Sequence, residues 1–218
     1  MPNALSSVVR AIISRVQERE GYTNKTKLVK FLYLFDVAHY RRTGRTLTGF
    51  PWRFHLYGPW ADDFEALYQE LTRNGDIEVT TGNRIDLDTE FLRTGDRVDV
   101  TNLVDDVTLG FEFRHIVDQW ADRRLGEMLD YVYFHTEPME AARRGDYLDF
   151  STVRRDRVEQ RFPERARIDR RVLKRLKRGV ERREAESAPE PEEFFTPPRY
   201  DEIYERARRM MEDEEDAY

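Results

Sequence analysis

The chain has 218 residues, of which 37% are charged and 39% are hydrophobic, and its formal net charge is −6. A length of this order holds one large domain, or a domain of about 150 residues with an extension. Because the sequence contains no Cys, disulfides, thiol catalysis and zinc sites built on Cys ligands are excluded. No apolar run reaches the roughly 18–20 residues that cross a bilayer, and the N-terminus lacks the pattern of a secretory signal. We therefore expect a cytoplasmic protein with no membrane partner.

The charge is distributed unevenly along the chain. Residues 1–150 carry a net charge of −6, residues 151–186 a net charge of +7 and residues 187–218 a net charge of −7. All three Trp and most of the other aromatic residues precede residue 150. These differences predict a folded domain over 1–150, a basic helical arm over 151–186, and a Pro-rich linker with an acidic amphipathic terminal helix over 187–218.

The first two elements are predicted to be helices. The spacing of apolar residues over 5–19 predicts an amphipathic helix, which Gly21 ends. A second helix, capped by Thr23 or Asn24, runs to about residue 42, and Gly44 closes it. Its apolar face covers more than half of its circumference, which places this helix at the centre of the core.

The next stretch combines an extended segment, a helix and a hairpin. Alternating aromatic residues over 50–57 predict an extended segment. A helix over 60–73 follows, and Pro59 presets its first turn. Two strands, at 77–79 and 84–87, are then expected to form a β-hairpin. A helix followed by a hairpin resembles the wing of a winged-helix module.

The remaining elements are predicted to be mostly helical. Residues 88–99 show no clear periodicity, whereas helices are expected over 107–123 and 125–135. A short helix over 139–143 has Thr136 as its cap and Pro138 at its start. Together the elements predict an α+β, predominantly helical fold: a compact helical domain with a short extended segment and one small, winged-helix-like β-hairpin, plus a helical C-terminal extension.

The common catalytic motifs are missing from the sequence. It contains no phosphate-binding loop, no G-x-G-x-x-G, no H-E-x-x-H and no G-x-S-x-G. The four His are scattered singly. Adjacent acids, Asp62-Asp63 and Asp105-Asp106, point in different directions on a helix and are better explained by the helix dipole than by a metal ion. We therefore predict no catalytic residue, no metal site and no cofactor.

Residues 24–77 contain an ordered series of short motifs. The series is Lys27-Leu28-Val29-Lys30-Phe31-Leu32-Tyr33, then Gly44 and Leu47, then Phe50, Trp52 and Phe54, then Tyr57-Gly58-Pro59, and finally Leu71 and Asn74-Gly75-Asp76-Ile77. This series resembles the Panacea domain, also called the SocA-like antitoxin domain. A second match, Thr136-Glu137-Pro138-Met139 with Ala141-Ala142, resembles the closing segment of that family. The resemblance covers about residues 5–150.

These motif residues also have a physical explanation. Lys27, Lys30 and Tyr33 are three residues apart, so they lie in a row beside the apolar face of their helix. A Lys stem can cover an aromatic ring while its ammonium stays in water. Gly58 permits an unusual backbone angle before the next helix. Structural roles are thus favoured over partner contact for the motif residues Lys27, Leu28, Lys30, Tyr33, Tyr57, Gly58, Pro59, Thr136, Glu137 and Pro138.

The resemblance implies a non-enzymatic protein that binds and neutralises a toxin. The family is associated with bacterial toxin–antitoxin pairs and also occurs in prophage contexts. Different members neutralise different toxins, so the resemblance names no particular toxin. The implied partner is a cognate toxin, and homo-oligomerisation stays open.

The C-terminal third lies outside the resemblance and contains the candidate partner-binding residues. The basic cluster can contact nucleic acid, form a solvated helix or pair with the acidic tail, and nucleic acid is the less favoured partner. The terminal helix either docks on its own domain or inserts into a partner. The candidates are Arg170, Arg171, Lys174, Arg175, Lys177, Arg178, Phe194, Phe195, Tyr200, Ile203, Tyr204 and Met210.

The alternative function is a DNA-binding transcriptional regulator. In this hypothesis the helix over 60–73 and the following hairpin form a winged-helix reader of DNA. The acids Asp62, Asp63, Glu65 and Glu70 count against it, because a recognition helix is expected to be basic.

Overall fold

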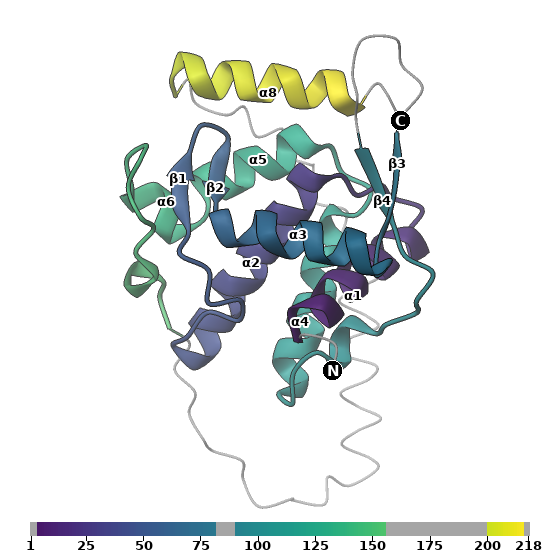
Figure 1. The fold of residues 1–218 in the computed structure, drawn as a ribbon. Helices are drawn as coiled ribbons and strands as arrows, with labels where there is room; N and C mark the ends of the chain where they lie inside the picture. The colour runs from purple at the N-terminus through teal and green to yellow at the C-terminus, as the bar shows by residue number, and fades with distance from the viewer. Residues whose placement is uncertain (1–3, 82–89, 156–199, 216–218) are drawn as a thin grey trace, which may run out of the picture. The chain divides into compact units, whose positions relative to one another are not determined.

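A computed structural model of the chain describes residues 4–81, 90–155 and 200–215 (Figure 1). The chain divides into two compact units, one of residues 1–156 with 199–218 and one of residues 157–198. The second unit lies outside the described residues, as does most of the predicted basic arm. The terminal helix belongs to the first unit, although more than 40 residues separate it from the rest of that unit in sequence.

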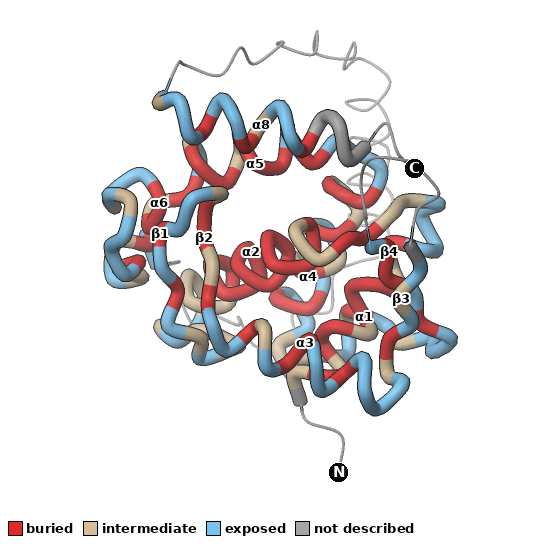
Figure 2. Tube along the Cα trace, turned by 45° about the horizontal axis from the view of Figure 1, so that its top comes forward, coloured by how far each residue is buried: buried red, intermediate tan, exposed pale blue. Residues whose placement is uncertain are grey.

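Two N-terminal helices carry much of the core. Helix α1 spans Ala4–Glu18 and α2 spans Lys25–Thr43. The side chain of Asn24 caps α2 by accepting a hydrogen bond from the backbone nitrogen of Lys27, and Gly44 closes it at φ 77°. Residues 27–38 of α2 are all buried, and Figure 2 shows this helix surrounded by the others. The predicted helices, the cap and the central position of α2 are confirmed.

A hairpin replaces the single extended segment that the sequence predicts. Strand β1, Arg53–His55, pairs antiparallel with β2, Gly58–Trp60. Helix α3 then spans Asp62–Asn74, and Gly75 closes it. The expectation that Pro59 opens this helix is wrong, because Pro59 lies in β2 opposite Phe54. Proline fits here since β2 is an edge strand, where its missing N–H removes no hydrogen bond from the sheet.

A second hairpin follows α3, as predicted, but with another partner strand. Strand β3, Glu78–Thr81, pairs antiparallel with β4, Glu90–Arg93. The predicted second strand, 84–87, lies outside the described residues, and β4 lies in a stretch where no strand was expected. The backbone nitrogen of Leu92 donates to the carbonyl oxygen of Thr23. Pairing with the segment before α2 therefore stabilises β4, which local periodicity does not reveal.

Three further helices complete the domain around α2. They are α4, Val107–Trp120, α5, Leu125–Phe134, and the short α6, Glu137–Ala141. Short 3₁₀ turns occupy Val100–Asn102 and Phe150–Thr152. The ring of Phe113 on α4 stacks on Phe35 of α2, with centroids 4.2 Å apart. All three predicted helices are present, although the shortest begins and ends two residues earlier than expected.

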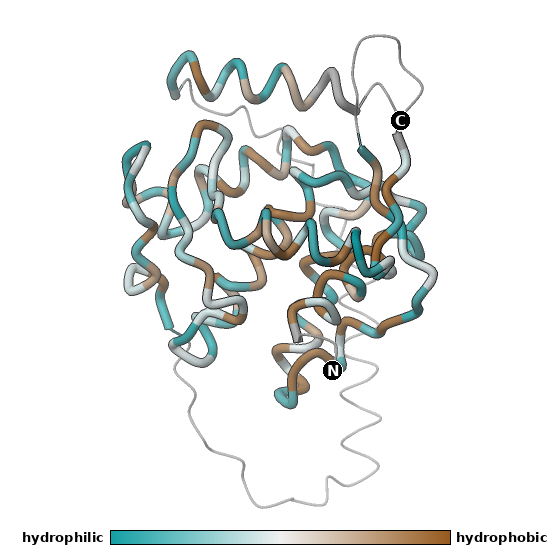
Figure 3. The backbone as a smooth tube through the Cα atoms, in the orientation of Figure 1, coloured by the Kyte–Doolittle hydropathy of each residue, from teal (hydrophilic) through white to brown (hydrophobic). Residues whose placement is uncertain are grey.

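The last element is α8, Glu202–Glu215, which packs against α5. Figure 3 shows hydrophobic residues in α1 and α2, whereas α8 is largely hydrophilic. Its apolar contacts come from one stripe, Tyr204, Ala207 and Met211, which are buried. The predicted α+β, predominantly helical fold is confirmed. Among the described helices, none combines the length and the apolar character that a bilayer crossing demands.

Candidate functional site

Lys27 and Lys30, two of the motif residues, are buried along their whole length. Their side chains expose 0% and 2% of their surface, so the expectation that the ammonium groups stay in water is wrong. The face of α2 that carries Lys27 and Lys30 is covered by other elements of the domain. The spacing of residues along the helix does not predict this covering. Each ammonium then needs acceptors inside the protein.

Lys27 links α2 to the junction of α4 and α5. Its Nζ donates to the carbonyl oxygens of Ala121 and Arg123, both at 3.0 Å, and lies 4.2 Å from the ring centre of Tyr22. The Ala121 carbonyl lies at the C-terminal end of α4, where carbonyls have no partner within the helix and carry partial negative charge, and the Arg123 carbonyl lies in the connection to α5. A buried ammonium can therefore satisfy them, which makes Lys27 a structural residue.

Lys30 links α2 to the Tyr57-Gly58-Pro59 motif. Its Nζ donates to the carbonyl oxygen of Pro59 at 3.2 Å. Burial lowers the pKa of Lys30 to about 7, because removal from water disfavours the charged amine. Two separate parts of the family motif thus meet in one buried contact beneath β2.

Gly58 is required at its position for two reasons. Its backbone has φ 92°, and a β-carbon there would lie 3.1 Å from Cε2 of Tyr133 and 3.4 Å from Nζ of Lys30. Side chains rarely adopt this backbone conformation. The predicted unusual angle at Gly58 is confirmed, and close packing against α5 adds a second constraint.

The substitution Gly58→Ala tests these two constraints, with Gly145→Ala as the matched control. Gly145 has φ 90°, but a β-carbon there would have no atom within 4 Å. We expect Gly145→Ala to lose about 1–2 kcal/mol of unfolding free energy from the backbone alone. Gly58→Ala is expected to lose about 1–3 kcal/mol more, because the methyl group crowds Tyr133. Urea denaturation measures both, and equal losses would contradict the crowding at Gly58.

Tyr33 joins the first motif to the closing segment, more than 100 residues away in sequence. Its hydroxyl lies 2.9 Å from Oγ1 of Thr136, which itself donates to the carbonyl oxygen of Val132 at 2.6 Å. Since the Thr136 proton is used in that second bond, Tyr33 is the donor in the first. Burial raises the pKa of Tyr33, which keeps the phenol protonated. Next to it, Glu137 pairs with Arg41 at 3.0 Å, and Pro138 is buried.

Substitutions at this contact are expected to have unequal effects. Tyr33→Phe leaves Thr136 with a partner and should lose about 1 kcal/mol of unfolding free energy. Thr136→Val leaves the Tyr33 hydroxyl buried without an acceptor and should lose about 1–3 kcal/mol. The double variant is expected to lose less than the sum of the two. Thermal or urea denaturation measures these losses, and strict additivity would argue against the contact.

Asp36 is a buried residue that the sequence analysis did not select. Its carboxylate accepts hydrogen bonds from the backbone nitrogens of Leu47 and Thr48, at 2.6 and 2.8 Å, from the Thr48 hydroxyl, and from Nε1 of Trp52 at 2.6 Å. Burial raises the pKa of Asp36, and these four donors oppose the rise. The sequence did contain a signal for this site, because Asp36 is a single acid within the apolar face of the helix predicted to be central. Its partners Leu47 and Trp52 both belong to the family motif series.

The terminal helix α8 docks through aromatic rings and two ion pairs. The hydroxyl of Tyr204 donates to the Asp130 carboxylate, and Nε of Arg208 lies 3.2 Å from the same group. At the other end, Arg144 binds both oxygens of Asp201 at 2.7 and 2.8 Å. Asp201 also accepts from the backbone nitrogen of Tyr204 and so caps α8.

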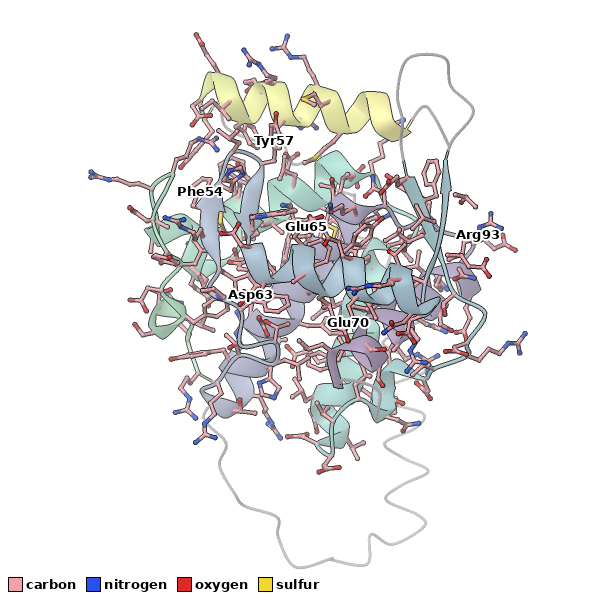
Figure 4. The ribbon with its side chains drawn as sticks, in the orientation of Figure 1. Phe54, Tyr57, Asp63, Glu65, Glu70 and Arg93 are labelled. Carbon is pink, nitrogen blue, oxygen red and sulfur yellow. The ribbon has the colours of Figure 1, made fainter. Side chains whose placement is uncertain are left out.

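The aromatic rings under α8 come from β1 and α5. The ring of Tyr133 lies 5.0 Å from Tyr204 and 5.6 Å from Tyr200, centroid to centroid. Phe134 contacts the same two tyrosines, and Phe54 stacks on Tyr200 at 6.4 Å. Figure 4 marks Phe54 on β1 and Tyr57 in the turn that follows it, on the side of the domain that α8 covers. We call this surface, formed by Phe54, Asp130, Tyr133, Phe134 and Arg144, the α8 groove.

The candidate partner-binding residues divide into two groups. Arg170, Arg171, Lys174, Arg175, Lys177, Arg178, Phe194 and Phe195 lie outside the described residues. On and before α8, Tyr204 is buried, whereas Tyr200, Ile203 and Met210 are exposed by 46%, 36% and 45%. Docking on its own domain, one of the two expected arrangements, is the one that α8 adopts. The sequence analysis missed the groove residues Asp130 and Arg144, because their contacts with Tyr204 and Asp201 form only when α8 docks.

The other expectations concern metal ions and DNA. Within residues 4–81, 90–155 and 200–215, no three acidic or His side chains are grouped as metal ligands would be.

Helix α3, the expected recognition helix, exposes Asp62, Asp63 and Glu70, and Figure 4 shows Asp63, Glu65 and Glu70 along it. This surface is acidic, which is unfavourable for contact with phosphates.

Comparison with known families finds a match over residues 28–123. The matching family model is described as Antitoxin SocA-like, Panacea domain, so the resemblance seen in the sequence is confirmed. Lys27 directly precedes the matched residues, and the closing segment at 136–138 lies beyond their end. No curated protein and no solved structure matches the chain.

Proposed function

We propose that the protein is a non-enzymatic antitoxin that binds and neutralises a cognate toxin of a bacterial or prophage toxin–antitoxin system. The observation that carries this proposal is the match of residues 28–123 to the antitoxin family model. In this proposal, residues 1–150 form the family-like domain, and residues 151–218 provide the contacts that are specific to one toxin.

The contacts of the motif residues support a binding role over a catalytic one. Lys27, Lys30, Tyr33 and Asp36 are all buried, and they hydrogen-bond to atoms of their own domain. A catalytic group must reach a substrate, whereas these groups hold segments of the domain together. Neutralisation by complex formation needs only a complementary surface on a stable domain.

The DNA-binding alternative receives no comparable support. Its recognition helix would be α3, and the acids exposed on that helix repel a phosphate backbone. We therefore advance the antitoxin function alone.

Co-expression with the product of the adjacent gene tests the proposal. We expect that product to arrest growth when it is expressed alone, and growth to recover when this protein is expressed in at least equal amount. The two proteins should also co-purify as a stoichiometric complex. Recovery at an expression level far below that of the toxin would point to catalysis, and neither recovery nor a complex would overturn the proposal.

A further inference from the structure

We propose that the α8 groove is a helix-binding site, and that a helix of the toxin occupies it in place of α8. The toxin as the source of this helix rests on the proposed function above. The helix-binding property of the groove rests on the structure alone.

The chemistry of the groove specifies the kind of helix that fits. Arg144 offers two N–H groups to a carboxylate at the N-terminal end of the bound helix, as Asp201 shows. Asp130 accepts hydrogen bonds from Tyr204 and Arg208, about one and two turns further along. The two charged residues of the groove have opposite signs, so they set the direction of the helix as well as its position.

Apolar contacts complete this recognition pattern. The stripe of α8 has aromatic residues at 200 and 204, a small residue at 207 and Met at 211, which is the spacing of a helix that binds through one face. Leu56, whose carbonyl oxygen accepts a hydrogen bond from Arg144, is 45% exposed even with α8 in place. Apolar surface thus continues beyond the covered part of the groove and is available to a longer or bulkier helix.

Helix α8 itself is a weak competitor for this site. It has 14 residues, and helices of this length are marginal in water without tertiary contacts. The sequence of its last turn, residues 212–215, is Glu-Asp-Glu-Glu, with no basic residue. Acids at the C-terminal end of a helix oppose its dipole. Part of the docking free energy therefore goes into forming α8, and a partner helix that is already folded avoids this cost.

The length of the intervening chain allows α8 to leave the groove. Residues 156–199 separate the described part of the domain from Tyr200, and most of them belong to the other compact unit. The pairing of β1 with β2 does not involve α8, so it can persist when α8 leaves.

The first experiment uses a fluorescent peptide of residues 199–215 and the full-length protein. The variant Tyr204→Ala/Arg208→Ala weakens α8 but leaves the groove intact, and Arg206→Ala, on the exposed side of α8, is the matched control. We expect the double variant to bind the peptide about tenfold or more tightly than the wild type, because apparent affinity follows the fraction of molecules with an empty groove. Adding Arg144→Ala should abolish this gain. A double variant that binds no peptide better than the control does would overturn the proposal.

The second experiment locks α8 in place and measures binding of the toxin. Since the chain has no Cys, Leu56→Cys, which is exposed and not one of the groove residues, and Tyr200→Cys can be joined specifically by a reducible thiol cross-linker, because Arg144 contacts both residues. We expect the cross-linked protein to bind the product of the adjacent gene about tenfold or more weakly than the same protein after reduction. Equal binding before and after reduction would overturn the proposal and leave the antitoxin function standing. Peptide binding without any binding of that product would instead reject the toxin as occupant, together with the proposed function.

Discussion

Asp36→Ala is expected to lose about 3–5 kcal/mol of unfolding free energy, the largest effect of any single substitution considered. The carboxylate of Asp36 receives four hydrogen bonds, two from backbone nitrogens of the Leu47–Thr48 segment, one from the Thr48 hydroxyl and one from Trp52. Alanine removes every acceptor at once and leaves these buried donors without partners. Because domains are typically stable by only about 5–15 kcal/mol, such a loss leaves little margin.

Two further variants serve as comparisons for Asp36→Ala. Asp36→Asn keeps the shape of the side chain, but its amide nitrogen replaces one acceptor and faces donors, so the loss is expected to be smaller yet substantial. Asp63→Ala, at an exposed position in the first turn of α3, loses only its interaction with the helix dipole and should change stability by at most about 1 kcal/mol. Guanidinium denaturation followed by far-UV circular dichroism measures all three. A small loss for Asp36→Ala would mean that other acceptors replace the carboxylate.

The stability of Lys30→Met relative to the wild type is expected to fall as the pH rises above neutral. The folded pKa of Lys30 is about 7, whereas an unfolded chain has a value of about 10.4. Between these values the unfolded chain holds one more proton than the folded one, so the stability of the wild type rises with pH by about 1.4 kcal/mol per unit. Methionine binds no proton and removes this dependence.

The measurement is urea denaturation of wild type and Lys30→Met at several pH values. Between pH 7.5 and pH 9.5 the unfolding free energy of the variant minus that of the wild type should fall by about 2–3 kcal/mol, from the slope above. Gly145→Ala changes no titratable group and serves as the control, whose difference from wild type should stay constant. A Lys30→Met difference that is independent of pH would contradict the buried, desolvated amine.

Local sequence patterns predicted the helices well because their signals lie within one turn of the chain. The apolar spacing of residues 5–19 and the cap at Asn24 depend only on neighbours a few residues away. The closing Gly44 and Gly75 likewise have φ values of 77° and 74°, which glycine adopts readily. Such features are encoded by residues a few positions apart, so they can be read from the sequence without knowledge of tertiary contacts.

The errors arose where distant segments decide the structure. Strand β4 forms because Leu92 and Phe91 pair with residues 23–24, far away in sequence. Pro59 lies in a strand because β1 offers it a partner, although a proline before a helical pattern usually marks a helix start. The lysines of α2 illustrate the same limit, since spacing places them on a face but does not tell whether that face meets water or protein.

The candidate site shows the same difference between features set by neighbouring residues and features set by distant segments. Tyr33 and Thr136 were selected through the family resemblance, yet their direct contact appears only in three dimensions. Asp130 and Arg144 had no motif, because their importance depends on α8, which reaches them from the far end of the sequence. Asp36 lay within reach of the sequence analysis, since an isolated acid on a buried helix face needs internal partners.

The contact of Lys27 with the α4–α5 junction has a practical consequence for protein engineering. Residues 122–124 are exposed and connect two helices, which would normally make them suitable for an inserted tag or a new chain terminus. Yet the carbonyls of Ala121 and Arg123 both bind the buried ammonium, and a side chain at Gly21 would collide with the Ala121 oxygen. Any insertion there would displace acceptors that a buried positive charge depends on. Labels and circular permutations should therefore avoid this connection, even though it is short and exposed.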